Sequence, residues 1–209
     1  MRKKRLYTRR QAALRRLVLT VIVAICVNHV CMTGFLIPWQ VRRLQQERYG
    51  IQNAEVIEKL YGKDWSAEWM YLTAGEDAML LSRMDWFPLL GWNSNGSNVL
   101  DCSGEAPFHV DWSQVGDGAK EIIFFGRAEK EDIREIEFLL ELPENAEIQG
   151  SPAWTGRLTA DQFIEKGGKR YFLVRMDWPH KVWAGKCTMT ATAYDGSGMV
   201  VEELELNRW

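Results

Sequence analysis

Apolar and polar positions follow three different patterns along this chain, and the first pattern is a long uncharged stretch. Residues 17–37 contain no formal charge over 21 positions. As a helix rising about 1.5 Å per residue, this stretch would reach roughly 31 Å, close to the thickness of the hydrocarbon core of a bilayer. The first pattern therefore predicts a single transmembrane helix over residues 17–37, in contact with the lipid bilayer.

The charges that flank this stretch predict its orientation. Residues 1–16 carry eight Lys and Arg and no acidic residue. By the positive-inside rule, the N-terminus is expected in the cytoplasm and the C-terminal part on the extracytoplasmic side of the cell membrane. A cleaved secretory signal is the alternative, but its apolar region usually runs about 7–15 residues and ends at a small-residue cleavage site. The longer stretch here favours an uncleaved signal-anchor.

Two polar residues, Asn28 and His29, lie in the middle of the predicted span. Polar groups at this depth are costly and often functional, and Asn and His can hydrogen-bond across helices. An intramembrane contact with another subunit is one interpretation of the pair. A tolerated polar pair in an otherwise adequate span is the other.

The second pattern has apolar residues three and four positions apart over residues 38–64, which is typical of a helix. These apolar positions are Val41, Leu44, Ile51, Ala54, Ile57 and Leu60. Gly50 weakens the middle of the pattern, since glycine costs about 1 kcal/mol relative to alanine in a helix. The segment is predicted to form a short helical juxtamembrane stalk, as two short helices or one bent helix.

The third pattern alternates with a period of two, which is typical of half-buried strands. It appears at 121–126 and 133–142, in two segments joined by Gly167-Gly168, and in the final hairpin over 186–206. Two glycines between strand patterns are a strong hairpin signal. Consecutive antiparallel hairpins of this kind predict a β-sandwich.

These patterns divide the chain into five parts. The predicted parts are a basic cytoplasmic tail (1–16), the transmembrane helix (17–37), the juxtamembrane helical stalk (38–64), a β-rich lead-in packed on the sandwich (65–118) and the sandwich itself (119–209). The predicted fold class is one N-terminal transmembrane helix plus a mainly-β domain.

A resemblance supports the sandwich. The sequence AGKCTMTATAYDGSGMVVEE, residues 184–203, resembles the last hairpin of bacterial immunoglobulin-like and fibronectin-like domains, with Cys187 at the place of a common tyrosine. Residues 125–127, 132–133 and 171–173 are similar to membrane-anchored sandwich proteins of Gram-positive bacteria. The resemblance covers residues 121–203 and implies an antiparallel immunoglobulin-like sandwich. It carries no catalytic residue, because a fold alone does not define a function.

The charge balance argues against nucleic acid as a partner. Of 26 Lys and Arg, eight lie in residues 1–16, so 18 remain against 28 Asp and Glu, a net charge near −10 for the rest of the chain. Nucleic-acid binding requires a clustered basic face that an acidic region lacks.

Cys102 and Cys187 are the cysteines that follow the predicted span. In an oxidising compartment they could form one disulfide, which would stabilise by about 4 kcal/mol in the chain-entropy model. Two separate buried thiols are the alternative, and sequence alone does not decide between them.

Motifs for metal, cofactor or nucleophilic chemistry are absent from the sequence. The three histidines lie far apart, and no Walker-type loop, dinucleotide turn or nucleophile elbow occurs. We therefore expect no cofactor, no metal and no catalytic residue. One internal echo remains, since Arg-Met-Asp-Trp at 83–86 recurs at 175–178. Asp85 and Asp177 could serve as the acid and base of a hydrolase. Turns at the ends of two strands, where Asp commonly begins a turn, are the favoured explanation of the echo.

The ten tryptophans are the remaining feature. Trp154, Trp178 and Trp183 are expected near strand ends, where flat rings can stack on sugars or anchor a protein, although such rings also fill sandwich cores. The sequence thus predicts a non-enzymatic, membrane-anchored binding or scaffolding protein of the bacterial cell envelope, with an envelope protein or glycan as partner. A carbohydrate-binding module using these tryptophans and a hydrolase using Asp85 and Asp177 are the alternatives.

Overall fold

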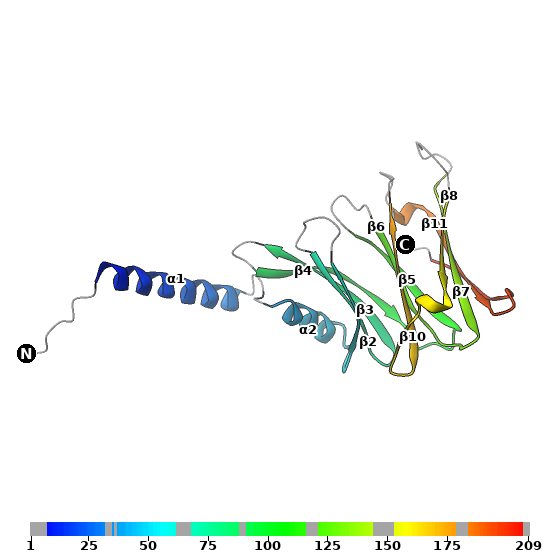
Figure 1. Ribbon diagram of the computed structural model, residues 1–209, viewed down its shortest axis with the longest axis horizontal. Coiled ribbons are helices and arrows are strands. Elements are labelled where there is room, and N and C mark those ends of the chain that lie inside the picture. Colours follow the sequence, from blue (N-terminus) through cyan, green and yellow to red (C-terminus); the bar gives the residue numbers. More distant parts are fainter. Residues whose placement is uncertain are drawn as a thin grey trace, which may run out of the picture.

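The computed structural model describes residues 8–31, 35, 37–61, 68–87, 91–115, 121–143, 153–178 and 184–206. Within these residues the chain is mainly β, with three four-stranded antiparallel sheets and two α-helices (Figure 1). The sheets are called A, B and C in the order in which they appear along the chain.

Sheet A is a simple meander in which neighbours in sequence are neighbours in space. Its strands are β1 (Glu55–Tyr61), β2 (Glu68–Ala74), β3 (Ala78–Phe87) and β4 (Gly91–Asp101), in the order β1-β2-β3-β4. All its pairs are antiparallel. The first half of the β region is therefore a self-contained sheet that needs only a second layer to cover its apolar side.

Sheets B and C interleave along the rest of the chain. Sheet B has the order β5-β6-β10-β9, and sheet C has the order β12-β11-β7-β8. The strands of sheet B are β5 (Phe108–Val115), β6 (Glu121–Ala128), β9 (Ile164–Lys166) and β10 (Lys169–Asp177). Those of sheet C are β7 (Ile133–Glu141), β8 (Ala153–Thr159), β11 (Thr188–Asp195) and β12 (Val200–Glu205). Two 3-10 turns, η1 (Ala160–Gln162) and η2 (Ala184–Lys186), connect strands.

Sheet B is the middle layer of three. Strand β6 shows why, because all eight of its residues are buried. Ile122 and Phe124 belong to the apolar core shared with sheet C, whereas Ile123 and Phe125 belong to the core shared with sheet A. Side chains alternate across a strand, so a strand that is apolar at every position must be covered on both faces.

The core between sheets B and C is the larger of the two and is built around phenylalanines. The Phe124 and Phe138 rings stack with centroids 4.5 Å apart, and Phe172 lies 6.2 Å from Phe138. All three side chains are fully buried. Each buried aromatic ring of this kind contributes about 1.5–3 kcal/mol by removal from water, so this core stabilises the packing of sheet B on sheet C.

Helix α2 (Pro38–Arg48) covers part of the outer face of sheet A, as Figure 1 shows. Pro38 is its first residue, a position where the missing N–H has no intrahelical partner to lose. Val41 is fully buried in a small cluster with Tyr71 of β2 and Met84 of β3. The layers therefore run α2, sheet A, sheet B, sheet C.

Helix α1 (Arg9–Cys31) projects away from the sheets (Figure 1). It begins with Arg9 and Arg10 and contains Arg15 and Arg16, and only 15 of its residues, 17–31, follow the last arginine. At 1.5 Å per residue these extend about 22 Å, short of the roughly 30 Å hydrocarbon core. Within the described ranges, no helix combines the length and the apolar character that crossing a membrane demands.

The transmembrane helix predicted over residues 17–37 is therefore wrong. Phe35 lies outside α1 and is bridged to Trp92 of sheet A, and Ile37 is the N-cap of α2. The single-pass topology, with a cytoplasmic N-terminus and an extracytoplasmic C-terminal domain, and the bilayer contact through these residues lose their basis with it. Asn28 and His29 lie in α1, but their side chains are outside the described part of the chain, and no intramembrane contact is assigned to them.

Of the segment predicted to be a helical stalk over residues 38–64, α2 is helical, and it packs on sheet A. After Gly50, which has a φ of 69°, the chain continues into β1, where the spacing of Ile57 and Leu60 had indicated a helix. A β-bulge between Val56 and Glu58 explains this spacing. It inserts one residue into β1, so that two residues three positions apart face sheet B on the same side.

Candidate functional site

The outer face of sheet A carries four neighbouring aromatic rings beside α2. Their residues are Tyr61 of β1, Trp69 of β2, Trp86 of β3 and Trp92 of β4, and together they are called the aromatic face. The ring centroids lie 5.2 Å apart for Tyr61 and Trp69, 4.8 Å for Trp69 and Trp92, and 5.7 Å for Trp86 and Trp92. These distances fall in the range of favourable aromatic pairs.

Strand register brings the four rings together. Tyr61 pairs with Trp69 across β1 and β2, and Trp86 pairs with Trp92 across β3 and β4. Directly opposed residues of antiparallel strands place their side chains on the same face, about 4.5–5.5 Å apart at Cβ. The rings thus form a row across all four strands of the sheet.

The rings are not a closed core. Tyr61 is 52% exposed and Trp86 is 42% exposed, while Trp69 and Trp92 are half-buried. Large rings at such exposure are unusual when they are contiguous, because isolated apolar residues on a surface are common but clustered ones mark interaction sites. The geometry supplies a preformed apolar surface.

Helix α2 covers the adjoining part of the same face. One buried side-chain amide anchors the helix there. Gln45 is 3% exposed, and its Nε2 donates to Ser94 Oγ at 2.6 Å and to the carbonyl oxygens of Gly96 and Arg83 at 3.1 and 3.4 Å. These contacts hold the helix at a fixed position on β3 and β4. The aromatic face therefore has a defined border.

The segment that precedes α2 reaches the sheet at Trp92. The backbones of Phe35 and Trp92 exchange two hydrogen bonds of 2.7 Å. Gly91 makes this approach possible, because a Cβ there would lie 2.5 Å from the Phe35 carbonyl oxygen, and its φ is 84°. A side chain at this position would push the segment off the aromatic face.

Two cations lie over the rings. The Nζ of Lys59 is 5.5 Å from the Trp69 centroid and 5.2 Å from the Tyr71 centroid, and the guanidinium of Arg42 is 5.4 Å from the Tyr71 centroid. Such contacts are cation–π interactions worth about 0.5–1 kcal/mol at exposed sites. The aromatic face thus has a basic rim.

Carboxylates lie on the opposite side of the same strands, between sheets A and B. Glu68 of β2 and Asp85 of β3 are register partners, and Glu68 is 5% exposed. Burial raises the pKa of Glu68 and the nearby Asp85 raises it further, with Arg83 acting in the opposite direction. Burial likewise raises the pKa of Asp85 against the effect of Arg83.

The echoed Arg-Met-Asp-Trp segments turn out to be two matching contacts between sheets A and B. Arg83 of sheet A donates from Nη1 to the Gln114 carbonyl of sheet B at 3.1 Å. Arg175 of sheet B donates from Nη1 to the Tyr61 carbonyl of sheet A at 3.0 Å, and its Nη2 lies 2.5 Å from Glu121 Oε2. Each arginine thus crosses to a backbone carbonyl of the facing sheet. Packing between the two sheets therefore explains the repeated Arg-Met-Asp-Trp sequence.

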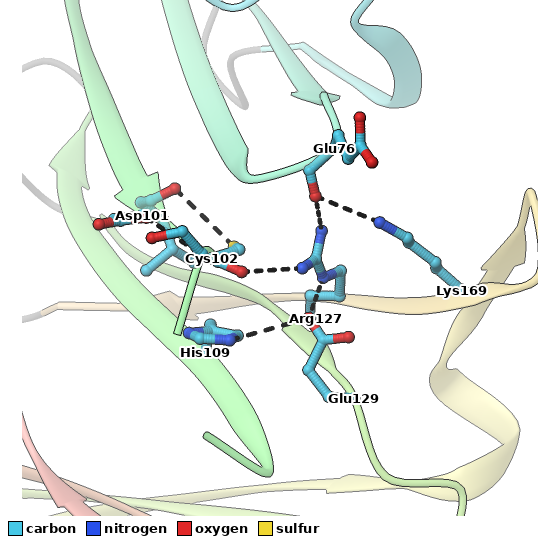
Figure 2. Close-up of polar contacts among 9 residues, drawn as sticks. Glu76, Asp101, Cys102, His109, Arg127, Glu129 and Lys169 are labelled. Atoms are coloured by element: carbon cyan, nitrogen blue, oxygen red, sulfur yellow. Dashed lines mark hydrogen bonds and ion pairs between the residues drawn. The ribbon is translucent and has the colours of Figure 1, made fainter. Parts of the chain in front are cut away.

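A third arginine joins the same two sheets at their other end, and Figure 2 shows its contacts. Arg127 of β6 is 3% exposed and donates to the carbonyl oxygens of Glu76 at 2.8 Å and Cys102 at 3.1 Å. Its Nε is ion-paired with Glu129, and Lys169 Nζ also reaches the Glu76 carbonyl, at 3.2 Å. This arrangement is called the Arg127 network, and it satisfies a cation whose burial would otherwise be costly.

The tryptophans predicted as a binding site do not form one surface. Trp178 is 2% exposed and belongs to the core between sheets B and C. Trp154 of β8 packs partly against that core, with its ring over Gly156, and Trp183 lies outside the described residues. The exposed ring cluster instead lies on sheet A.

Asp85 and Asp177, the predicted acid and base, lie on different sheets. Asp85 is opposite Glu68 on β2, and Asp177 is opposite Glu121 on β6. Both strands end at the boundary between sheets A and B, where the carboxylates Glu68 and Glu121 are nearly inaccessible, 5% and 6% exposed. Asp177 itself is exposed and Asp85 is partly exposed.

Of the two alternatives for Cys102 and Cys187, the structure has the separate thiols, both free and buried. Cys102 belongs to the core between sheets A and B, whereas Cys187 belongs to the core between sheets B and C. Sheet B separates them. Burial raises the pKa of Cys102 to about 11 and also raises the pKa of Cys187, so neither is a reactive thiolate at neutral pH.

Among the described residues, no group of three or more His, Cys, Asp or Glu is placed to hold a metal ion. His109 is buried on β5, with its Nε2 3.8 Å from Glu129. It belongs to the Arg127 network (Figure 2).

Comparison with known proteins adds no relative to this picture. No protein-family model matches the chain, and no curated protein or solved structure matches it either.

Sequence reasoning missed the aromatic face because its members come from four strands that the alternation did not clearly mark. Residues 68–71 (EWMY) and 86–92 contain three of the four rings, but the segment between residues 63 and 112 lacks a clean period. The signal that could have found the site is the number of aromatic residues between Tyr61 and Trp92.

Proposed function

We propose that this chain is a non-enzymatic binding protein and that the aromatic face of sheet A takes its partner, a protein segment with apolar anchors and acidic neighbours. The observation that carries the proposal is the row of four rings at centroid separations of 4.8–5.7 Å, of which Tyr61 and Trp86 are about half exposed. Aromatic side chains in a contiguous, preformed patch are the usual anchors of protein interfaces, since they bury large areas at small entropic cost.

The surroundings of the rings favour a protein over a sugar. The adjoining residues Ile37, Trp39 and Leu44 are 45–46% exposed, so the segment that leads into and along α2 adds further apolar surface. Sugars need side-chain hydrogen bonds around the ring faces, whereas an apolar surface with a rim of cations suits an apolar segment flanked by Asp or Glu. Lys59 and Arg42 supply that rim.

The non-enzymatic part of the proposal rests on how the acidic residues are used. Glu68 and Glu121 are buried between sheets, and Arg175 pairs with Glu121. General acid–base catalysis by a pair of carboxyl groups needs both within reach of one substrate. Asp177 is exposed and Asp85 is partly exposed, but they lie on different sheets, opposite Glu121 and Glu68. A hydrolase that uses Asp85 and Asp177 is therefore the weaker hypothesis. A binding or scaffolding role for the aromatic face is the stronger one.

The part of the chain from β5 to β12 is, in the same proposal, an immunoglobulin-like sandwich. Its sheet orders, β5-β6-β10-β9 and β12-β11-β7-β8, correspond to strands A-B-E-D and G-F-C-C′ when the strands are lettered along the chain. Sheet A is then an addition that covers the outer face of the A-B-E-D sheet. An added sheet with a free aromatic surface fits a module that presents a partner site.

The test compares three forms of the full-length chain, purified with an affinity tag from the cells that normally make it. The forms are the natural sequence, a Tyr61→Ala/Trp86→Ala variant, and a control in which the exposed apolar residues Met199 and Val200 of the β11–β12 hairpin become alanine. We expect a specific protein to accompany the natural sequence and the control and to be lost from the aromatic variant. Truncation of one anchor ring typically costs about 2–4 kcal/mol of binding free energy.

Two results would overturn the proposal. One is the recovery of the same proteins with all three forms. The other is a change of tryptophan fluorescence on titration with polysaccharide that disappears in the Tyr61→Ala/Trp86→Ala variant while no protein is recovered, which would assign the face to carbohydrate binding.

A further inference from the structure

A polar groove lies at the end of the molecule opposite the aromatic face. It has a volume of about 480 Å³ and is formed by the turn between β6 and β7 and the turn between β9 and β10. Its floor lies near the first residues of β1, because Lys166 contacts Glu55 and the Val56 carbonyl, whereas Tyr61 of the aromatic face is the last residue of β1. The groove is therefore a separate site.

Five basic and three acidic residues line the groove, and their partners decide its net charge. Lys166 is neutralised by Glu55 at 3.1 Å, a residue outside the groove. Lys169 and Arg170 hydrogen-bond to backbone carbonyls, which leaves their charge without a carboxylate.

The other two cations, Lys130 and Arg134, are exposed, and within the described part of the chain their side chains have no hydrogen-bond or ion-pair partner. Four cations thus remain without an acidic partner.

The three acidic residues add less negative charge to the groove than their number suggests, because one of their carboxylates is ion-paired within the Arg127 network. Figure 2 shows Glu129 turned toward the buried Arg127, with which it is ion-paired. Glu131 and Glu165 are the two carboxylates left to the groove. Among the residues that the structure describes, four groove cations without a carboxylate partner stand against the carboxylates of Glu131 and Glu165, so the groove is net positive. The residues after the N-terminal segment carry a net charge near −10.

The walls of the groove are fixed in place. Arg170 donates to the carbonyl oxygens of Lys130, Glu131 and Ile133 at 3.4, 3.2 and 2.9 Å, and its guanidinium lies 4.2 Å from the Phe163 ring centroid. On the other wall, Gly167 and Gly168 have φ values of 58° and 73°, as a tight two-residue hairpin requires. These contacts fix the backbone of both turns, so that a ligand would have to order only the side chains of Lys130 and Arg134.

We propose that this groove, here called the basic groove, binds an oxyanion, the carboxylate or phosphate group of a ligand, through Lys130 and Arg134. Arg134 presents a planar fork that matches two oxygens of such a group, and Lys130 adds a point charge from the neighbouring turn. Lys169 and Arg170 supply the background positive field. The site is distinct from the aromatic face, and its occupation does not depend on the proposed function.

The experiment is isothermal titration of the full-length chain with inorganic phosphate and, separately, with citrate, at low ionic strength. We expect saturable binding of at least one anion, at least about tenfold weaker in a Lys130→Gln/Arg134→Gln variant, since each charge-assisted contact is worth about a tenfold change or more. A control Arg48→Gln/Lys186→Gln variant removes the same charge elsewhere and should bind within about twofold of the natural sequence. Both altered residues of the groove are exposed and unpaired, so folding is expected to be unchanged.

The two arms identify the chemistry of the ligand: phosphate binding alone points to a phosphorylated ligand, and citrate binding alone points to a polycarboxylate. Absence of saturable binding in both arms overturns the proposal. Equal weakening in the groove variant and the control also overturns it, because a general field rather than the groove would then hold the anion. A single Arg134→Glu variant should abolish binding, and retention of affinity there would be equally contradictory.

Discussion

The outer faces of sheets A and C are the two outside surfaces of the same three-sheet stack, and they are built in opposite ways. On sheet C, Arg157 pairs with Glu135 at 3.0 Å and Glu137 at 4.0 Å, and the Tyr194 hydroxyl donates to Glu137 at 3.2 Å. On sheet A, the corresponding surface carries the aromatic face and the apolar residues on which α2 packs.

The outer face of sheet C is polar, as expected of a surface in contact with water, whereas the outer face of sheet A is apolar, as expected of a surface that is covered. An antiparallel sheet with one solvated face places charged and hydroxyl side chains there, as sheet C does. Sheet A is already half covered by a helix of its own chain, and the rings beyond that helix have the same apolar character as the part under it. Within the three sheets, the uncovered remainder is an apolar surface that a partner would shield from water.

The largest expected effect concerns the attachment of sheet A to sheet B, on which its outer face depends. Arg127→Met removes the donors to the Glu76 and Cys102 carbonyls and leaves Glu129 without its cation. We expect the free energy of unfolding to fall by about 3 kcal/mol, because buried groups lose their partners. Urea denaturation measures this, with the exposed Arg43→Met as the matched control. A loss no larger than that of the control would show that the network does not hold the sheets together.

A smaller effect is expected where α2 borders the aromatic face. Gln45→Leu deprives Ser94 Oγ and the Gly96 carbonyl of their donor, and we expect a loss of about 1–2 kcal/mol of unfolding free energy. Hydrogen exchange of the α2 amides should accelerate while exchange in β7 and β11 stays unchanged. Uniform acceleration across the three sheets would contradict the view that α2 is a local cover.

The next effect is a dependence on pH beneath the aromatic face. Burial raises the pKa of Glu68 above its ordinary 4.5 and the pKa of Asp85 above its ordinary 3.8. The folded state therefore holds these protons more tightly than the unfolded state. The stability they contribute is fully present below the ordinary values and is lost as the pH rises through the raised ones.

Glu68→Gln cannot ionise, so its unfolding free energy should decline less between about pH 4 and neutrality than that of the natural sequence. Denaturation curves collected across this range give the comparison. A steeper decline in the variant would reverse the sign and reject burial as the cause of the raised pKa.

The smallest effect belongs to the outer face of sheet C. Arg157 is 59% exposed in its side chain, and Arg157→Ala removes two surface ion pairs. Such pairs are typically worth about 0–1 kcal/mol, so the melting temperature should hardly move. A loss comparable to that of Arg127→Met would remove the distinction between the solvated face and the interface.

Much of the β region could be predicted from alternation alone. The buried run at 121–126, the alternating segment at 133–142 and the hairpin around Gly167-Gly168 became β6, β7 and the pair β9–β10. These segments share a simple cause, since each strand has one constant environment per face. The final hairpin was equally clear, and β11 and β12 pair as expected.

The errors come from positions where local spacing has more than one cause. The bulge in β1 gives Ile57 and Leu60 a helix-like separation. The uncharged stretch 17–37 does not reveal that its helix includes Arg15 and Arg16 and ends at Cys31. The echoed arginines were equally ambiguous, because sequence cannot show that Arg83 and Arg175 face each other's sheets. The aromatic face forms only through the register between strands. The sequence of one segment does not determine that register.

The most direct test of the central claim places a photo-crosslinking aromatic residue at position 86 on sheet A or at position 157 on sheet C, in the full-length chain inside the cells that make it. Irradiation is predicted to give a discrete covalent adduct with a second protein from position 86 and none from position 157. Equal adducts from both positions, or none from position 86, would contradict the assignment of the aromatic face as the partner surface.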